Sequence, residues 1–244
     1  MSTQSQPIVQ NVMVNEETTL QFTPISVELV DHMGSDLSVV NAARVSFAKE
    51  SLWIDGQFNN LSVRDQKLIE YLATHNHWSP FGHAFASFRI KAPIGCARQL
   101  SKSTVGLCWN EVSRRYVSYE PEVYAVESWR GAPVNAKQGS DGVPTLGQEA
   151  VAAMYTQVTT QAVEAYNALI AGGVAPEQAR LILPQGMMTE WIWSGSLAAF
   201  ARIAKLRLAP DTQKETREVA HGIAVEMERL FPVSFKALVA IWKA

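Results

Sequence analysis

Cysteine is nearly absent from this chain, which carries two in 244 residues, Cys96 and Cys108. Two cysteines are too few for the disulfide framework of a small secreted protein, and their spacing matches neither a redox pair nor a zinc motif. We therefore expect a reducing compartment, by default the cytoplasm.

Long apolar runs and an export signal are also missing. No apolar stretch approaches the roughly 18 residues that a membrane-spanning helix needs. The polar stretch Met1 to Asn15 has neither the basic nor the apolar region of a signal peptide. We expect neither export nor insertion into a membrane.

Positive charge is not in excess, because 21 basic residues face 23 acidic ones and the formal net charge is −2. Proteins that bind nucleic acid polymers usually carry a basic excess that neutralises the phosphates. The balance argues against such a partner. The balance does not exclude a small anionic ligand, since one phosphate needs only a few local cations.

The sequence does hold enough apolar residues for a sizeable core, and its length fits one domain or two tightly fused lobes. Residues 1–24 are rich in Ser, Thr, Gln and Asn, which predicts a loose arm with one short strand near residues 7–14. No linker, repeat or low-complexity tract divides the remainder. We expect a single catalytic domain over residues 25–244.

Hydrophobic periodicity predicts a mixed α/β fold in which helices predominate. Strands are expected at residues 25–30, 84–91 and 187–194, and an exposed loop at 131–147. Ser35, Ser62 and Asp211 are expected as helix N-caps. The expected helices cover residues 36–47, a segment from 63, a segment from 93, then 148–171, 176–183, 197–206, a segment ending at 230, and 232–242.

The densest polar constellation lies between Arg98 and Tyr116. Its Arg and Lys side chains can neutralise a phosphate, and Ser113 can donate a hydrogen bond to it. Gln99 or Asn110 can pair with a base edge through an adjacent donor and acceptor. The alternative is a solvated surface with salt bridges.

Three histidines, His75, His77 and His83, invite a zinc hypothesis, but no neighbouring Cys or acidic pair completes a ligand set. We therefore expect no metal. His77 lies beside the turn residues Ser79 and Pro80 and is better suited to hydrogen-bond a cofactor. Alternatively, it caps the end of the preceding helix.

Two arginines interrupt apolar helical segments, Arg180 and Arg207. Arginine in such a place usually meets a buried anion or an anionic ligand. The alternative is pairing with a nearby glutamate such as Glu177 or Glu215.

The remaining features of the sequence indicate less about function. Trp109, Trp191 and Trp193 could line a flavin or base pocket, or be core residues. Neither cysteine has the context of a catalytic nucleophile. A Gly-rich dinucleotide fingerprint is missing, so any flavin or nicotinamide binds by another architecture.

Several segments of the chain, in order, resemble the flavin-dependent thymidylate synthases over residues 26–242. The segments are Met33-Gly34-Ser35-Asp36, Ala42-Ala43-Arg44-Val45-Ser46, His77 with Ser79-Pro80-Phe81-Gly82-His83, Ala92-Pro93 with Ala97-Arg98-Gln99, Asn110-Glu111-Val112-Ser113 with Arg115-Tyr116, Ala179-Arg180 to Leu183-Pro184, and Leu206-Arg207.

The resemblance implies a helix-rich fold around a mainly antiparallel sheet, assembled into homotetramers with shared active sites. It implies FAD beside dUMP, methylenetetrahydrofolate as the one-carbon donor, NADPH as the reductant and no cysteine adduct. By position, it assigns Ser46, His77, Ser79 and Lys102 to FAD. It assigns Gln99, Glu111, Ser113, Arg115 and Arg180 to the nucleotide and places Arg207 against the uracil ring. Arg207 and Ser113 are the residues expected to act in catalysis.

The chain departs from the family pattern at two places. Lys102-Ser103-Thr104 stands where the family signature begins Arg-His-Arg, and Ser196 and Ala198 replace an asparagine and an arginine. The variant resembles viral members, which would place the protein in a host cytoplasm. Two alternatives stay open: a related C5 modification such as hydroxymethylation of dUMP or dCMP, and a non-catalytic nucleotide-binding protein.

Overall fold

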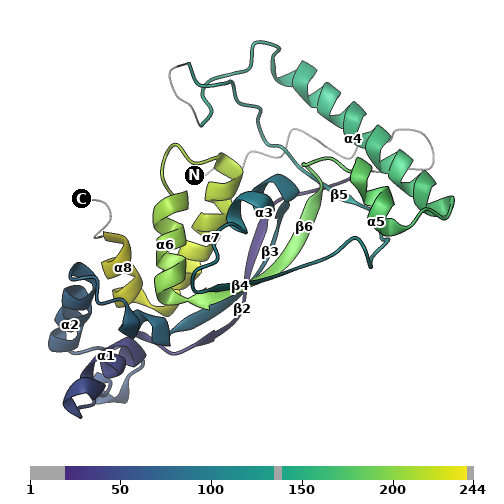
Figure 1. Ribbon diagram of the computed structural model, residues 1–244. Coiled ribbons are helices and arrows are strands. Elements are labelled where there is room, and N and C mark those ends of the chain that lie inside the picture. The colour runs from purple at the N-terminus through teal and green to yellow at the C-terminus, as the bar shows by residue number, and fades with distance from the viewer. Residues whose placement is uncertain (1–19, 135–138, 241–244) are drawn as a thin grey trace. The chain divides into compact units, whose positions relative to one another are not determined.

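The computed structural model describes residues 20–134 and 139–240, with the elements labelled in Figure 1. The chain forms two compact units. The first unit comprises residues 20–26, 91–100 and 111–190, and the second comprises residues 27–90, 101–110 and 191–240. Because neither unit is continuous in sequence, no composition shift marks a boundary between them.

A four-stranded sheet provides the frame. Its strands lie in the order β2-β3-β6-β4. Their bounds are Ser26–Met33 for β2, Phe85–Pro93 for β3, Met188–Ser196 for β6 and Leu107–Glu111 for β4. The chain passes from one unit to the other within each of these four strands, and once more between Leu100 and Ser101.

Backbone hydrogen bonds give the strand directions. The amide of Leu197 donates to the carbonyl of Ala84, and the amide of Ile94 donates to Met187. One sequence number rises as the other falls, so β3 and β6 are antiparallel. The bonds from Ser196 to Gly106 and from Val112 to Glu190 give the same result for β6 and β4. The expected mainly antiparallel sheet and mixed α/β class are confirmed.

The second unit carries most of the helices. They are α1 (Asp36–Arg44), η1 (Val45–Phe47), η2 (Ile54–Gly56), α2 (Val63–Thr74), η3 (Ser79–His83), α6 (Leu197–Arg207), α7 (Lys214–Leu230) and α8 (Pro232–Ala240). Helix α6 packs against α7 and α8, and α8 packs against α2. Helix α7 lies close to β2, because a Cβ added to Gly222 would come within 2.9 Å of the Val27 side chain. Only glycine allows this approach.

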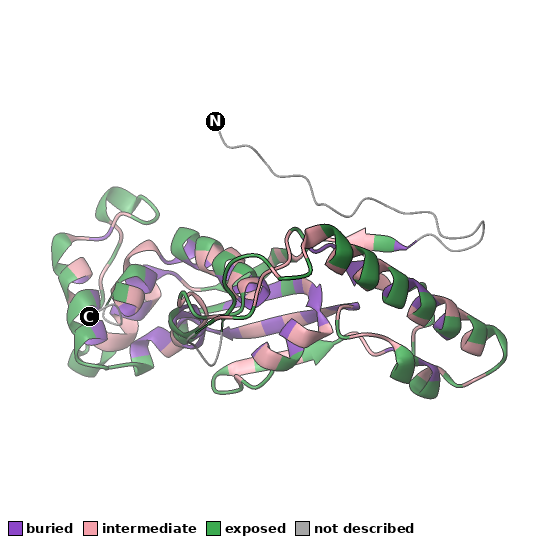
Figure 2. Ribbon diagram, turned by 90° about the horizontal axis from the view of Figure 1, so that it is seen from above, coloured by how far each residue is buried: buried purple, intermediate pink, exposed green. Residues whose placement is uncertain are grey.

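The first unit is built around a long helix, α4 (Gln148–Ala171). Strand β1 (Gln21–Thr23) pairs in parallel with β5 (Glu122–Tyr124). The remaining elements are α3 (Ile94–Leu100), α5 (Pro176–Ala179) and η4 (Arg180–Ile182). One face of α4 is buried and the other is exposed, as the colours along this helix show (Figure 2).

Most expected elements are observed, and a few differ. Asp211 is not an N-cap, because Ala209–Thr212 closes a turn and α7 begins only at Lys214, after Gln213. The helix expected at 176–183 divides into α5 and η4, where the backbone tightens before Pro184. Strand β1 falls inside the stretch expected to be a loose arm, because β5 supplies it with a partner.

Two other expectations reach beyond the described residues. The strand expected near residues 7–14 and the end of the helix expected at 232–242 lie outside the described residues. Strands β4 and β5 were not expected from the sequence.

No helix within the described ranges is both long and apolar enough to cross a membrane.

Candidate functional site

A tight turn in the first unit presents two of the residues expected to bind a nucleotide, Ser113 and Arg115. The amide of Tyr116 donates to the carbonyl of Ser113 at 2.9 Å, which closes the turn. The Arg115 Nε atom donates to the Ser113 hydroxyl at 3.2 Å, and its guanidinium lies 5.0 Å from the centre of the Tyr116 ring. A hydroxyl and an exposed cation are thus paired on one short loop.

The other residues expected to bind a nucleotide in this unit lie on separate elements. Glu111 ends β4, is exposed, and accepts a hydrogen bond from the Thr189 hydroxyl at 2.8 Å. Gln99 lies half-buried near the end of α3. Arg180 begins η4, where its Nε atom donates to the carbonyl of Glu177 and its side chain is exposed. A backbone oxygen of Glu177 accepts this bond, so the contact is not the ion pair with a carboxylate that was the alternative for Arg180.

In the second unit, Ser46 lies in η1 at the start of a constrained loop. Three non-glycine residues in the loop have left-handed backbone, Ala48, Asp55 and Asn59. Each such residue costs on the order of 1 kcal/mol or more, so the loop needs outside support.

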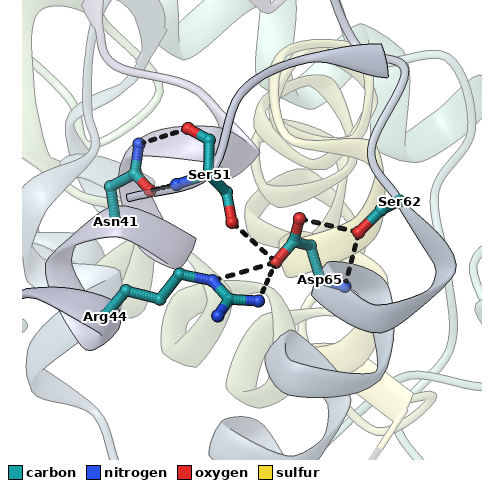
Figure 3. Close-up of polar contacts among 5 residues, drawn as sticks. All are labelled: Asn41, Arg44, Ser51, Ser62 and Asp65. Carbon is teal, nitrogen blue, oxygen red and sulfur yellow. Dashed lines mark hydrogen bonds and ion pairs between the residues drawn. The ribbon is translucent and has the colours of Figure 1, made fainter. Parts of the chain in front are cut away.

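The support comes from Asp65, which is 3% exposed at the start of α2 (Figure 3). Its carboxylate accepts hydrogen bonds from Arg44, from the Ser51 hydroxyl at 3.0 Å and from the Ser62 hydroxyl at 2.7 Å. The amide side chain of Asn41 adds two bonds to the Ser51 backbone. The end of α1, the loop and the start of α2 are therefore joined at one carboxylate.

Hydrogen bonding decides the charge state of this carboxylate. Burial alone would raise the pKa of Asp65, but the bonds from Arg44, Ser62 and Ser51 together with the Arg44 charge hold it below its usual value. Asp65 is therefore an anion at neutral pH, and the tether is charge-assisted.

His77 lies in the segment between α2 and η3, where it lines a cavity of about 130 Å³ in the second unit. Its ring meets the Tyr71 ring edge-on at 6.1 Å. The remaining lining is mostly apolar, and its one cationic side chain is Arg202: Leu72, Ala73, Asn76, Trp78, Phe81, Ala198, Arg202 and Leu238. Ser79 follows at the start of η3 and is exposed.

Arg202 was not expected from the sequence as a site residue. It follows Ala198 by four residues on α6, so the two share one face of the helix. Its guanidinium donates to the carbonyl of Val105. The signal that could have identified it is this spacing from Ala198, at which the family pattern has an arginine and this chain has none.

Arg207 is the last residue of α6 and is half-buried. Burial lowers the pKa of its guanidinium, because the charged form loses hydration. A partly desolvated cation at a helix C-terminus suits an anionic or carbonyl partner. Lys102 follows α3 and is exposed.

The three tryptophans in question form a cluster in the second unit. Trp109 stacks on Trp191 with ring centres 4.4 Å apart and meets Trp193 edge-on at 5.4 Å. Trp191 and Trp193 are fully buried. They belong to the core, and Trp109 is half-buried against them.

The side chains present can be compared with what a metal ion and a flavin would each need. Among residues 20–134 and 139–240, no group of three or more His, Cys, Asp or Glu residues could hold a metal ion. The cavity beside His77 has aromatic and aliphatic walls with one imidazole and one guanidinium, which suits part of a planar heteroaromatic ring system. The residues present therefore fit a flavin.

Comparison with known proteins places this geometry in a family. The model of the thymidylate synthase complementing proteins, Thy1, matches residues 28–233. A flavin-dependent thymidylate synthase of Thermus thermophilus is 38% identical over 211 residues, covering 86% of this chain and 74% of the relative. The corresponding enzyme of Kosmotoga olearia is 34% identical over 213 residues, covering 86% and 88%.

Solved structures agree with the sequence relatives. The structure of PolB, a UMP/dUMP methylase from Streptomyces cacaoi bound with 5-Br dUMP, matches with a TM-score of 0.78 at 30% identity and covers 91% of this chain and 97% of its own. The chain belongs to the flavin-dependent thymidylate synthase family and is an enzyme of this type.

Proposed function

We propose that this enzyme converts dUMP to dTMP by reductive methylation, with FAD as cofactor, methylenetetrahydrofolate as the one-carbon donor and NADPH as the reductant. The observation that carries the substrate is the match to a methylase whose solved structure holds 5-Br dUMP, over nearly the full length of both chains. Membership of the flavin-dependent family supports the cofactor.

The nucleotide is held by charge and by hydrogen bonds. Arg115 and Arg180 are exposed cations that can form paired bonds with phosphate oxygens, and the hydroxyl of Ser113 is already oriented beside Arg115. Gln99 offers an adjacent donor and acceptor for a base edge. Glu111 completes the set as an acceptor for a sugar or base group.

Arg207 acts on the uracil ring. A ring activated at carbon 5 gathers negative charge on its carbonyl oxygens, and a partly desolvated guanidinium stabilises that charge more strongly than a hydrated one. This polarisation takes the place of a cysteine adduct. The two cysteines of the chain are assigned no nucleophilic role.

The flavin is held by Ser46, His77, Ser79 and Lys102, with the cavity beside His77 accepting part of its ring system. When bound, FAD supplies the hydride that the reductive step needs. The Asp65 tether fixes the loop that carries Ser46, and the apolar walls of the cavity exclude water. In solution we expect a homotetramer with shared active sites, located in the cytoplasm.

The test is the absorbance spectrum of the purified protein during anaerobic NADPH addition, with and without dUMP, followed by mass analysis of the nucleotide after addition of methylenetetrahydrofolate. Flavin bands that bleach faster with dUMP, and a product heavier by one methylene, are expected. A product heavier by a hydroxymethylene group would show C5 hydroxymethylation instead. A colourless protein that cannot be reconstituted with FAD would contradict the proposal and favour a non-catalytic nucleotide-binding role.

A second substrate has a specific observation behind it. The matching methylase was also solved with 5-Br UMP, at a TM-score of 0.78 and 29% identity. Turnover of dUMP, UMP and dCMP measured side by side decides which nucleotide this chain prefers.

A further inference from the structure

Arg114 is a buried cation to which the proposed function assigns no role. It lies between the two nucleotide-binding residues Ser113 and Arg115, yet its side chain points away from solvent and it is only 6% exposed. Arginine is rarely buried without compensating contacts, so the interior contacts of Arg114 call for a reason.

Those contacts form an anchor made of two rings and a carbonyl. The guanidinium carbon lies 4.7 Å from the centre of the Tyr119 ring and 5.6 Å from that of Tyr166. The Nη1 atom donates to the carbonyl of Tyr119 at 2.7 Å. Tyr166 is fully buried on α4, so the anchor ties the turn to the long helix of the first unit.

The charge of Arg114 is also compensated. Burial alone would raise the pKa of Glu122, but hydrogen bonds from Lys91 and Thr23 and the positive charges of Lys91 and Arg114 lower it overall. Glu122 is therefore an anion at neutral pH. The buried guanidinium faces both π-electron density and a negative charge.

The contacts of the Arg115 side chain are local to the turn. They are the Ser113 hydroxyl and the exposed Tyr116 ring. Both partners lie on the same turn, so neither ties the turn to the rest of the unit. Arg114, placed between them in sequence, is the residue of this turn that reaches the interior.

We infer that Arg114 is a positioning residue, which holds the Ser113–Arg115 pair in the orientation that receives the nucleotide phosphate. The inference rests on the proposed function. Arg114 acts through its neighbours and makes no contact with the nucleotide itself. A planar guanidinium is needed because it can lie over aromatic faces while it donates a hydrogen bond in its own plane, which a lysine ammonium cannot do.

The test compares Arg114→Met, which keeps bulk but removes the charge and the donors, with Arg114→Lys, which keeps only the charge. Arg130→Met is the matched control, because Arg130 is a half-buried arginine of the same unit whose Nε atom donates to Ser140, away from the turn. For each FAD-loaded protein we would measure the dUMP dissociation constant by calorimetry, kcat and KM, the flavin content and the melting temperature.

The expected result for Arg114→Met is a dissociation constant and a KM for dUMP raised about tenfold, with kcat within about twofold and the flavin retained, as for a lost orienting contact. Arg114→Lys should recover part of the affinity, and Arg130→Met should match the wild type. A purely structural role would instead lower melting temperature, flavin content and kcat together, and that pattern overturns the inference.

Other outcomes separate this inference from the function on which it rests. If the wild type binds no pyrimidine nucleotide, the proposed function fails before any variant is compared. If the wild type binds dUMP and both Arg114 variants bind it equally well, only the positioning role fails. Should Arg114→Met not fold, Arg114→Lys decides: weaker dUMP binding at an unchanged melting temperature supports the role, and unchanged binding refutes it.

Discussion

Two buried carboxylates of the second unit show how much the partner of a side chain matters. Asp65 is paired with a full positive charge from Arg44, and its pKa falls. Asp36 is also buried, but burial raises its pKa, and the Ser234 side chain and the backbone amides of Val233 and Ser234 offset this only in part. A guanidinium stabilises the anion more than amide dipoles do.

The Asp65 tether makes stability depend on pH. Since its folded pKa lies below the unfolded value of about 3.9, its contribution is present above that value and is lost as pH falls through the folded pKa. We expect Asp65→Asn to cost about 3 kcal/mol at neutral pH, as for a broken buried pair. Thermal unfolding at neutral and acidic pH measures this. A deficit that did not shrink in acid would contradict the assignment.

Arg202 offers a direct test of the cavity beside His77. As its one cationic lining residue, it should assist flavin binding, and Arg202→Ala should weaken FAD affinity about tenfold, the value of a single charged contact. Titration of the apoprotein with FAD, followed by flavin fluorescence, measures the change. Arg217→Ala is the control, because Arg217 is a half-buried arginine that likewise donates to a backbone carbonyl, that of Pro210. Equal affinities would exclude the cavity as a flavin contact.

Some residues of the site can be identified from the sequence, and others only from their contacts in the fold. Ser113, Arg115 and Arg207 stand in polar runs or at family positions, so a sequence can single them out. The role of Arg114 depends on Tyr166, which meets it from a helix far along the chain. Asp65 likewise resembles any acidic residue in a first helical turn until Arg44 and Ser51 are seen beside it.

At the scale of elements, local signals determined the helices best. Helix α4 was expected with the bounds it has, because Gly172 and Gly173 stop it, and Ser62 caps α2 as expected through the amide of Asp65. Strand β5 was missed for a physical reason. It has three residues and its partner β1 lies about a hundred residues away, so no local pattern encodes the pairing.

Helix α8 has an N-cap from a distant part of the chain. The Asp36 carboxylate, at the start of α1, accepts the amides of Val233 and Ser234 at 2.9 Å each. We expect Asp36→Ala to destabilise the protein by about 1–2 kcal/mol, as for a lost cap, and Asp36→Asn by less, since it keeps one acceptor oxygen. Chemical denaturation measures both.

The pH dependence of this cap has the opposite sign to that of Asp65. A raised folded pKa gives a contribution that is complete below the unfolded pKa and is lost as pH rises through the folded value. Asp36→Asn should therefore lose least, relative to the wild type, at the higher pH. The reverse trend would show that the carboxylate is stabilised as an anion.

For the whole molecule, alternation along β3 and β6 and helical periodicity were enough to predict the fold class. The division into two units was not predictable, because each unit is assembled from separated segments. Of the residues expected at the site, Gln99, Glu111, Ser113, Arg115 and Arg180 fall in the first unit. Ser46, His77, Ser79, Lys102 and Arg207 fall in the second.

Shared active sites can be tested by mixing inactive proteins. Arg180→Ala removes a nucleotide contact from the first unit, and Arg207→Ala removes one from the second. If subunits share sites, dissociating and reassembling the two variants together should restore part of the wild-type activity, because some sites then receive both arginines. Each variant reassembled alone is the control. A mixture as inactive as its components would show that each chain builds its own site.

The contact between Asp36 and the start of α8 spans nearly two hundred residues, as does the close approach of Val27 to Gly222. A ribosome adds about 5–20 residues each second. The first strand and helix of the second unit must therefore wait roughly 10–40 s for their C-terminal partners. During that interval their apolar faces stay uncovered, so the nascent chain should need chaperone protection until its last helices emerge.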